Sequence, residues 1–286
     1  MKIAVALTTT AVLGACAAIV GAAVVFSGVY DISASRQHTQ TVYSLLETTM
    51  HHSVQRRARQ ITPPPLDDPQ RIARGAALFH DKCVQCHGAP GVSQDDIGKS
   101  MQPVPGPLVD ALQRWRPREI YWITRHGIKM SGMPAWEFRL EDSQLWDITA
   151  FIVHLPTLTP AAYADITRRA GETASPSPAT SPHATASTVA PSTIGSVERG
   201  KQALYQYACN ACHTIPGVTG SAASVGPPLV GIARRGLIAG RLANTPDNMM
   251  EWIRHPQKFK PQTAMPDLGV TEPHARDMAA YLATLR

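Results

Sequence analysis

Four cysteines of this chain fall into two pairs, and a histidine follows each pair immediately. The two segments are Cys83-Val84-Gln85-Cys86-His87 and Cys209-Asn210-Ala211-Cys212-His213. Thiols at this spacing can form thioether bonds to the two vinyl groups of one haem, and the imidazole of the next residue can then bind the iron. Because this attachment pattern occurs twice, the sequence predicts two covalently bound c-type haems.

Other uses of paired cysteines fit these segments less well. A disulfide framework is disfavoured, because each pair has a trailing histidine and no further cysteines with which to pair. A zinc site needs four ligands. A thioredoxin-like redox pair needs a βαβ pattern, whereas the residues that flank both pairs have a helical pattern and are rich in proline. The haem interpretation is therefore preferred for both segments.

The surroundings of the two motifs repeat, which indicates that the chain contains the same unit twice. Arg74-Gly75 and Arg199-Gly200 each begin a helical pattern that leads into a cysteine pair. A Pro-Gly-Val turn follows each motif, and then a loop rich in Gly and Pro that ends in Leu-Val. An apolar helix is expected to close each half, where Ala150-Phe151-Ile152 matches Ala280-Tyr281-Leu282.

These features resemble class I cytochrome c, in which an amino-terminal helix with a glycine crosses a carboxy-terminal helix with an aromatic residue. The resemblance covers residues 70–158 and 196–286. It implies an all-α fold of two class I cytochrome c domains. It also implies that a methionine, often beside a proline, completes the iron coordination, and Met133-Pro134 and Met265-Pro266 occupy the expected places.

The resemblance thus implies two complete sets of haem-binding residues. They are Cys83, Cys86, His87 and Met133 for the first haem, and Cys209, Cys212, His213 and Met265 for the second; the iron ligands are His87, Met133, His213 and Met265. Met130 and His126 compete for the first iron, and the more distant Met249, Met250 and Met278 compete for the second. By the same resemblance, a proline carbonyl in the loops Gly106-Pro107 and Gly226-Pro227 should hold each ligating imidazole.

A long apolar stretch begins near the amino terminus. No charged residue occurs from Ile3 to Tyr30, and about 20 apolar residues are enough for a helix to cross a bilayer. Residues 1–30 are therefore predicted to form a transmembrane anchor, with the short end in the cytoplasm because Lys2 precedes the run. Two alternatives stay open: a cleaved signal peptide and a lipoprotein cleavage box at Leu13-Gly14-Ala15-Cys16.

The rest of the chain divides into four segments. Residues 31–69 are predicted to contain a juxtamembrane amphipathic helix, because apolar residues recur at helical spacing between residues 41 and 61. This helix is expected to dock on a partner subunit, to lie against lipid headgroups or to pack on its own domain. Residues 70–160 and 196–286 are the predicted cytochrome c domains 1 and 2. Residues 161–195, rich in Pro, Ala, Ser and Thr, are the predicted linker.

Composition and charge narrow the function. Hydrophobic residues make up 44% of the 286 residues, enough for buried cores, and the net charge of +6 is modest. No nucleic-acid-binding motif accompanies that charge, so nucleic acid is not a predicted partner. His/Met ligation fills both axial positions of a haem iron and raises its potential, which favours electron transfer over catalysis. No catalytic residue is predicted.

The predicted function is a membrane-anchored dihaem c-type cytochrome that transfers electrons in a periplasmic respiratory chain. Its haem domains would lie on the periplasmic side of the bacterial inner membrane. The segment from Arg234 to Met265 resembles the cytochrome c domain of caa3-type oxidase subunit II, so a terminal oxidase is the predicted partner. The chain has no further cysteine pair for a copper-A centre, however. The alternatives are an electron-transfer subunit of a membrane-bound dehydrogenase, or a dihaem enzyme such as a peroxidase or thiosulfate dehydrogenase.

Overall fold

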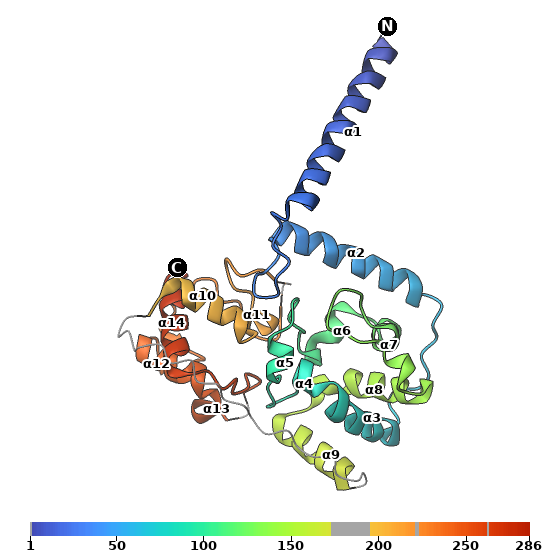
Figure 1. The fold of residues 1–286 in the computed structure, drawn as a ribbon. Coiled ribbons are helices and arrows are strands. Elements are labelled where there is room, and N and C mark those ends of the chain that lie inside the picture. Colours follow the sequence, from blue (N-terminus) through green and yellow to red (C-terminus); the bar gives the residue numbers. More distant parts are fainter. Residues whose placement is uncertain (1, 173–194, 221–222, 262) are drawn as a thin grey trace. The chain divides into compact units, whose positions relative to one another are not determined.

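The computed structural model describes residues 2–172, 195–220, 223–261 and 263–286 (Figure 1). Most of these residues are helical, which confirms the predicted all-α class. Within the described ranges the strands are limited to β1 (Leu237–Ile238) and β2 (Leu242–Ala243), which pair antiparallel in a small hairpin. The contacts divide the chain after Gln37 into two units, which are described separately below.

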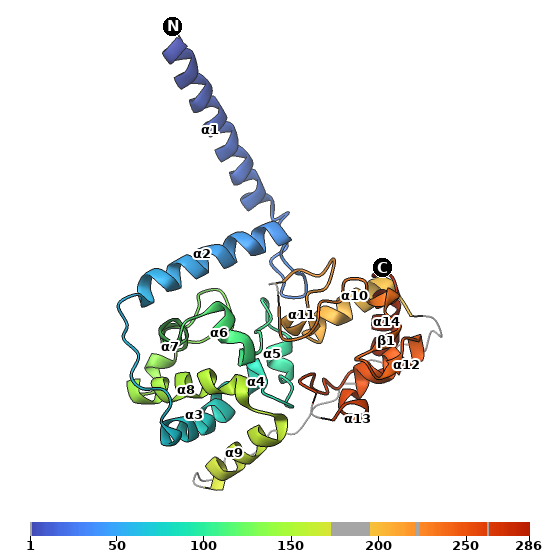
Figure 2. The ribbon, with the colours of Figure 1, turned by 180° about the vertical axis from the view of Figure 1, so that it is seen from behind.

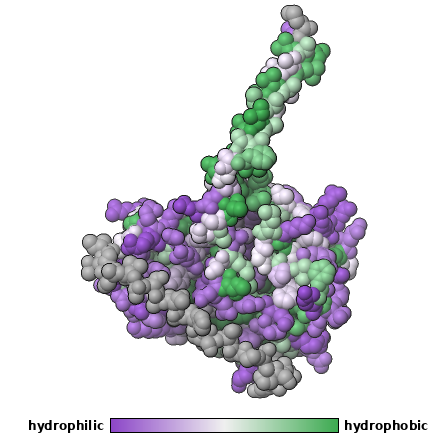
Figure 3. Space-filling view, in the orientation of Figure 1, coloured by the Kyte–Doolittle hydropathy of each residue, from purple (hydrophilic) through white to green (hydrophobic). Residues whose placement is uncertain are grey.

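The first unit contains a single long helix, α1 (Lys2–Ser27). Apolar residues lie along most of its length (Figure 3). The side chains of Ile3, Leu13 and Phe26 are all exposed. In the part of the chain that the structure describes, α1 is the one helix whose length and composition would allow it to cross a membrane. A signal sequence would share these properties, so the retained anchor stays a prediction.

The second unit begins with α2 (Gln40–Ala58), the helix expected between residues 41 and 61. Val54 and Ala58 are buried, and the helix packs on α7 (Pro117–His126) of the first cytochrome domain. The imidazole of His51 stacks on the indole of Trp115 with 4.0 Å between ring centroids. Of the three predicted roles for this helix, the structure therefore shows packing on its own domain, although Leu45 and Leu46 remain exposed.

The first cytochrome domain is built around the crossing of its first and last long helices, α3 and α8 (Figure 1). Two residues stabilise the start of α3. The side chain of Asp68 caps the helix by accepting a hydrogen bond from the backbone N–H of Gln70, and Pro69 occupies the first helical position. Phe79 and Phe151 meet in the core, where both are completely buried. Its elements in chain order are α3 (Pro69–Lys82), α4 (Val84–His87), α5 (Asp96–Lys99), η1 (Leu108–Asp110), α6 (Ala111–Arg114), α7, η2 (Trp136–Phe138), α8 (Asp142–His154) and η3 (Leu155–Thr157).

The range predicted as a linker contains a further helix, α9 (Pro160–Glu172). This differs from the expectation because Tyr163 and Ile166, at helical spacing, pack against the core of the first domain. Tyr163 is only 1% exposed, and its ring lies near that of Phe151. The remainder of the predicted linker, residues 173–194, lies outside the described residues.

The second cytochrome domain repeats this plan, which confirms the predicted duplication. Its first and last helices, α10 and α14, pack together as α3 and α8 do (Figure 2). The core contains the side chains of Leu204, Trp252 and Met278. Its elements are α10 (Val197–Gln206), α11 (Cys209–Cys212), η4 (Ile232–Arg234), β1, β2, α12 (Pro246–Arg254), α13 (Pro256–Phe259) and α14 (Glu272–Leu282).

Each helix crossing depends on a glycine and an ion pair. A Cβ atom added to Gly75 would lie 2.6 Å from the carbonyl carbon of Asp147, and one added to Gly200 would lie 2.5 Å from that of Asp277. The residues before the two glycines pair with the same two aspartates. Nε of Arg74 lies 2.8 Å from Oδ2 of Asp147, and Nε of Arg199 lies 2.7 Å from Oδ2 of Asp277. Both aspartates are buried.

The two Arg-Gly pairs are part of the predicted repeat, whereas their aspartate partners were not predicted. Each aspartate stands three residues before the alanine of the closing apolar triplet, a repeated signal that the sequence does contain. A buried carboxylate is unfavourable without a cationic partner. The two aspartates could therefore have been predicted from the sequence only as the partners of Arg74 and Arg199.

Asp277→Asn should make the second domain less stable and less sensitive to acid. Burial raises the pKa of Asp277, but hydrogen bonds from Arg199 and from the Ser196 backbone N–H outweigh burial and hold the pKa below its usual value. A lowered folded-state pKa contributes stability above the unfolded pKa of about 3.9 and loses it as pH falls through the folded value. Arg199 is 59% exposed, so we expect a loss of about 2 kcal/mol at pH 7, below that of a fully buried pair.

The measurement is denaturant unfolding of the haem-loaded chain between pH 7 and pH 2. The difference between the native chain and Asp277→Asn should shrink below about pH 4. Asp67→Asn, at an exposed aspartate, is the control and should change little. Equal stability of the native chain and Asp277→Asn at pH 7 would contradict the role given to this ion pair.

Candidate haem sites

Both cysteine pairs lie on a short turn at the end of the first helix of their domain. In domain 1 the turn is α4, which Cys83 immediately precedes, and in domain 2 it is α11; all four thiols are free. Burial raises the pKa of the Cys83 thiol and of the Cys209 thiol to about 12, and that of Cys212 to about 11. Reactive redox or nucleophilic cysteines have lowered pKa values instead. The protonated thiols therefore disfavour the thioredoxin-like alternative.

The described side chains around these turns do not form a ligand set for zinc. No group of three or more His, Cys, Asp or Glu side chains suited to a metal ion occurs among the residues that the structure describes. Each cysteine pair is accompanied only by its own histidine, and four ligands are normal for structural zinc. Two thiols and one imidazole per domain match the needs of a c-type haem.

A backbone carbonyl holds each histidine that follows a cysteine pair. Nδ1 of His87 lies 2.7 Å from the carbonyl oxygen of Gly106, and Nδ1 of His213 lies 2.7 Å from that of Pro227. A carbonyl oxygen only accepts hydrogen bonds, so Nδ1 must carry the proton and Nε2 is left with its lone pair. That tautomer is the one that binds a metal through Nε2.

Burial favours the neutral form of both imidazoles. It lowers the pKa of His87 and of His213, and the hydrogen bond to the carbonyl opposes this shift only in part. A protonated imidazole has no lone pair for a metal, so the lowered pKa extends the range of pH over which each histidine can bind iron.

The two carbonyls are equivalent in the repeat, although they belong to different residue types. Each precedes the proline of a Pro-Leu-Val sequence, Pro107 in domain 1 and Pro228 in domain 2. The residue before a proline is restricted to extended conformations. The expected proline carbonyl is found in domain 2, but in domain 1 the acceptor is Gly106 and not Pro107.

Gly226 brings the backbone directly against the imidazole of His213. A Cβ atom at this position would lie 2.6 Å from Nδ1 and 2.8 Å from Nε2 of the ring. Only glycine therefore leaves room for the ring in its present orientation. The orientation of the imidazoles and the free thiols fit a covalently attached haem at both sites, and the close approach of Gly226 adds to this fit in domain 2.

The two predicted methionine ligands lie in loops of similar construction. A hydroxyl two residues earlier accepts a hydrogen bond from each methionine N–H, at 3.2 Å from Met133 to Ser131 and at 3.4 Å from Met265 to Thr263. Gly127, with φ of 65°, ends α7 and packs against the backbone of Met133. Both methionines are half-buried. Their assignment as iron ligands stays a prediction.

The competing residues occupy less suitable positions. Met130 is 99% exposed, whereas Met249 and Met278 are buried in the core of domain 2. Nδ1 of His126 lies 3.2 Å from a carboxylate oxygen of Glu137. One methionine near the Met133 loop was not predicted from the sequence. A Cβ atom on Gly132 would lie 3.0 Å from Cε of Met101, so the Met101 side chain reaches this loop from a distant part of the chain.

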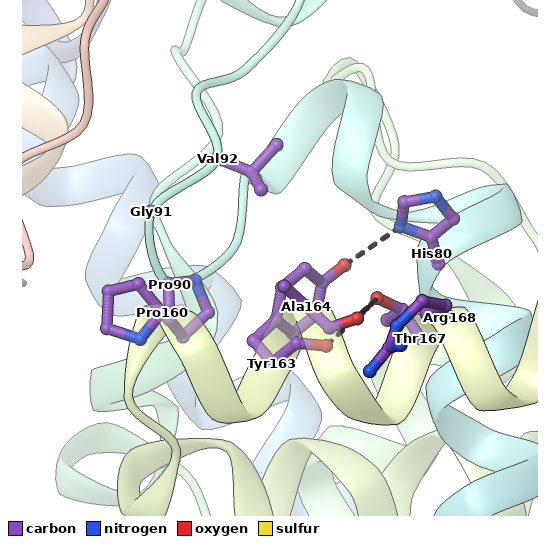
Figure 4. Close-up of a pocket in the computed structure, with 9 residues that line it drawn as sticks. All are labelled: His80, Pro90, Gly91, Val92, Pro160, Tyr163, Ala164, Thr167 and Arg168. Carbon is purple, nitrogen blue, oxygen red and sulfur yellow. Dashed lines mark hydrogen bonds between the residues drawn. The ribbon is translucent and has the colours of Figure 1, made fainter.

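A hollow of about 380 Å³ lies between α9 and the turn 90–92 (Figure 4). At its edge, Nδ1 of His80 lies 3.1 Å from the hydroxyl of Tyr163. Burial raises the pKa of that hydroxyl, so it stays protonated at neutral pH. The predicted haem ligands do not line this hollow, which is therefore separate from the haem sites.

Comparison with known proteins assigns both domains to the same class. Residues 70–152 match the family described as cytochrome c oxidase, cbb3-type, subunit III, and residues 197–286 match the cytochrome c family. The chain is 36% identical over 97 residues to cytochrome c2 of Rhodopila globiformis, a match that covers 29% of this chain and 88% of that protein. The chain therefore belongs to the cytochrome c family.

A second relative resembles only a small part of the chain. Cytochrome c oxidase subunit 2 of Alkalihalophilus pseudofirmus is 38% identical over 88 residues, which is 31% of this chain and 24% of that subunit. The match thus spans about a quarter of the oxidase subunit. No solved structure gives a significant match.

Met133→Ala and Met265→Ala should each open one iron to external ligands. A thioether is a weak donor that favours the reduced state, so each variant should also lower the potential of one haem and leave the other unchanged. Near-infrared spectra of the oxidised chain should lose the Met-to-iron charge-transfer band of one haem, and a redox titration should show the lowered potential. Met130→Ala, at an exposed methionine, is the control. Loss of the band in Met101→Ala or Met130→Ala, but not in Met133→Ala, would overturn the first assignment.

Proposed function

We propose that this chain is a membrane-anchored dihaem c-type cytochrome that transfers electrons in a periplasmic respiratory chain. The observation that carries the proposal is the repeated arrangement of a neutral imidazole, held at Nδ1 by a carbonyl, beside a free cysteine pair. A bound haem supplies an iron that gains and loses one electron. Cytochrome c domains imply electron transfer, and two such domains imply two haems.

The protein residues hold and orient this group at each site. Cys83 and Cys86 would bind the first haem through thioether bonds, and His87 would bind its iron through Nε2. Cys209, Cys212 and His213 would do the same for the second. The carbonyls of Gly106 and Pro227 fix the ring orientation and the ligand basicity of the two histidines. Met133 and Met265 would be the second protein ligands of the two irons, and an iron with two protein ligands favours electron transfer over binding of a substrate.

We further propose that the partner is a terminal oxidase complex in the bacterial inner membrane. Support comes from the match of domain 1 to an oxidase subunit family and from the similarity of domain 2 to an oxidase subunit. The helix α1 would be the anchor, with the haem domains on the periplasmic side. Attachment to the membrane would keep the two haem domains close to the complex that they serve.

Purification from the native membrane tests this function. The chain, tagged at its carboxy terminus and solubilised in mild detergent, should co-elute with haem-copper oxidase subunits, and those subunits should reoxidise the reduced chain. Cys16→Ala is the matched variant for the anchor. It should stay in the membrane if α1 is the anchor, and the whole-protein mass of the native chain should then include residues 1–15; a lipid-bearing native chain that begins at Cys16 would indicate lipidation. Co-elution with dehydrogenase subunits, and no reoxidation by an oxidase, would contradict the proposed partner.

A further inference from the structure

The segment of residues 102–113, which includes η1 and most of α6 and is called the shared loop below, belongs to domain 1 but also contacts domain 2. It contains Gly106, whose carbonyl holds the imidazole of His87. At its beginning, Oε1 of Gln102 accepts a hydrogen bond of 2.8 Å from the hydroxyl of Tyr205. Two residues later, Val104 packs against the hydrophobic core cluster of domain 2. The shared loop therefore serves the first haem site and contacts the second domain with adjacent residues.

The far end of the shared loop approaches the second haem site itself. The hydroxyl of Ser224 lies 2.8 Å from Oε1 of Gln113 and 3.3 Å from Oδ2 of Asp110. Ser224 stands two residues before Gly226, which lies against the imidazole of His213. The charge of Asp110 contributes to the raised pKa of Cys212, although burial is the larger cause. One loop thus connects the surroundings of both histidines.

The buried Asp110 makes separation of the two domains unfavourable. Its side chain is only 6% exposed and is paired with Arg114 at 3.4 Å as well as with Ser224. Removal of domain 2 would take away one of these hydrogen bonds and would expose Val104 to water. Loss of a hydrogen bond to a charged group and of apolar burial both oppose separation.

The beginning of α2, together with His38 just before it, makes a second connection between the domains. The hydroxyl of Thr219 in domain 2 donates a hydrogen bond of 3.0 Å to the carbonyl of His38. The backbone N–H of Gly220 donates to Oε1 of Gln40 at 3.4 Å. The other end of the same helix is buried against domain 1 through Val54 and Ala58. The helix therefore contacts both domains.

We propose that the shared loop and the beginning of α2 form a docking surface that holds domain 2 on domain 1. The two haem sites would then be one electron-transfer unit of fixed spacing. The inference rests on the proposed function in that both haems must carry electrons, but the docking itself does not depend on that function. Without docking, the spacing of the two haem sites would vary.

Hydrogen exchange of the full, haem-loaded chain in detergent tests the docking. Val104→Asp places a charge against an apolar core, so the docked population should fall about tenfold or more. Backbone amides of the shared loop and of residues 205–220 should then exchange faster together. Val92→Asp, the same substitution at an exposed valine of domain 1, is the matched control and should leave both segments protected. Unchanged protection in Val104→Asp would overturn the proposal.

Substitutions that remove single hydroxyl groups test the docking surface even if Val104→Asp fails to fold. The double variant Tyr205→Phe, Ser224→Ala changes only domain 2, yet it should speed exchange in the shared loop of domain 1. Tyr207→Phe removes the hydroxyl that lies 3.0 Å from His274 within domain 2, and it should not affect the shared loop. If the double variant exchanges as slowly as the native chain does, the shared loop is not a docking surface.

A second readout separates this proposal from the proposed function. Electron exchange between the two haems, followed after partial reduction of the full chain, should slow severalfold in the double variant and stay unchanged in Tyr207→Phe. If electrons pass slowly between the haems of the native chain although its amides are protected, the two haem sites are not a single electron-transfer unit. If the amides of the shared loop are already unprotected in the native chain, while the oxidase complex still reoxidises that chain, docking is overturned and the proposed function is left intact.

Discussion

A chain in which Cys209 and Cys212 are both replaced by serine should carry one haem, whereas the native chain should carry two. Serine is close to cysteine in size, but its hydroxyl does not form the thioether bonds that hold a c-type haem. The pyridine haemochrome assay, referred to the polypeptide concentration, should therefore fall by half. Whole-protein mass should fall by the mass of one haem beyond the change expected from the two substitutions.

The exposed Cys16 provides the control for this prediction. Cys16→Ser should retain both haems, since this residue belongs to α1 and has no histidine beside it. The reciprocal variant, Cys83→Ser with Cys86→Ser, should also carry one haem. A native chain with one haem per polypeptide would contradict the prediction directly, as would a serine variant that keeps two.

Gly200→Ala should unfold the second domain at a much lower temperature than in the native chain. The added Cβ would lie 2.5 Å from the carbonyl carbon of Asp277, a distance that real Cβ atoms do not reach, so α10 and α14 must move apart. The atom that it meets belongs to the helix backbone and cannot rotate away as a flexible side chain can. Forced separation of packed elements costs about 3 kcal/mol, at the upper end of the usual range for overpacking.

Thermal unfolding of the haem-loaded chain, followed by the Soret band, measures this effect. Gly236→Ala in the same domain is the matched control, because its Cβ would meet nothing within 4 Å and its stability should change by less than about 1 kcal/mol. Gly75→Ala should produce the corresponding loss in domain 1. A Gly200→Ala chain as stable as Gly236→Ala would show that the crossing of α10 and α14 tolerates a wider spacing.

Several features of the fold could be predicted because they depend on neighbours in the chain. The haem motif needs two thiols and an imidazole within five residues, so its chemistry is visible without any knowledge of folding. The duplication, the helices and the Pro-Leu-Val loops are repeated local patterns of the same kind. They led to the all-α class and to the two cytochrome c domains, both of which are confirmed.

The differences arise where packing chooses among local alternatives. Residues 161–172 belong to the predicted linker of residues 161–195, but burial of Tyr163 makes them part of a helix that packs on the first domain. The helix α2 had three possible surfaces to cover, and Val54 and Ala58 are buried on its own domain. Composition and helical spacing do not specify which surface an apolar side chain meets.

The amino-acid sequence alone therefore determined which atoms can bind a haem, in the thiols of each cysteine pair and the imidazole beside them. Only the tertiary structure decided which carbonyl holds each imidazole, Gly106 or Pro227, and which buried aspartate pairs with Arg74 or Arg199. It also decided that the shared loop of domain 1 contacts Tyr205 and Ser224. The reason is that covalent and local chemistry depends on spacing along the chain, whereas these partners meet only after distant segments have packed together.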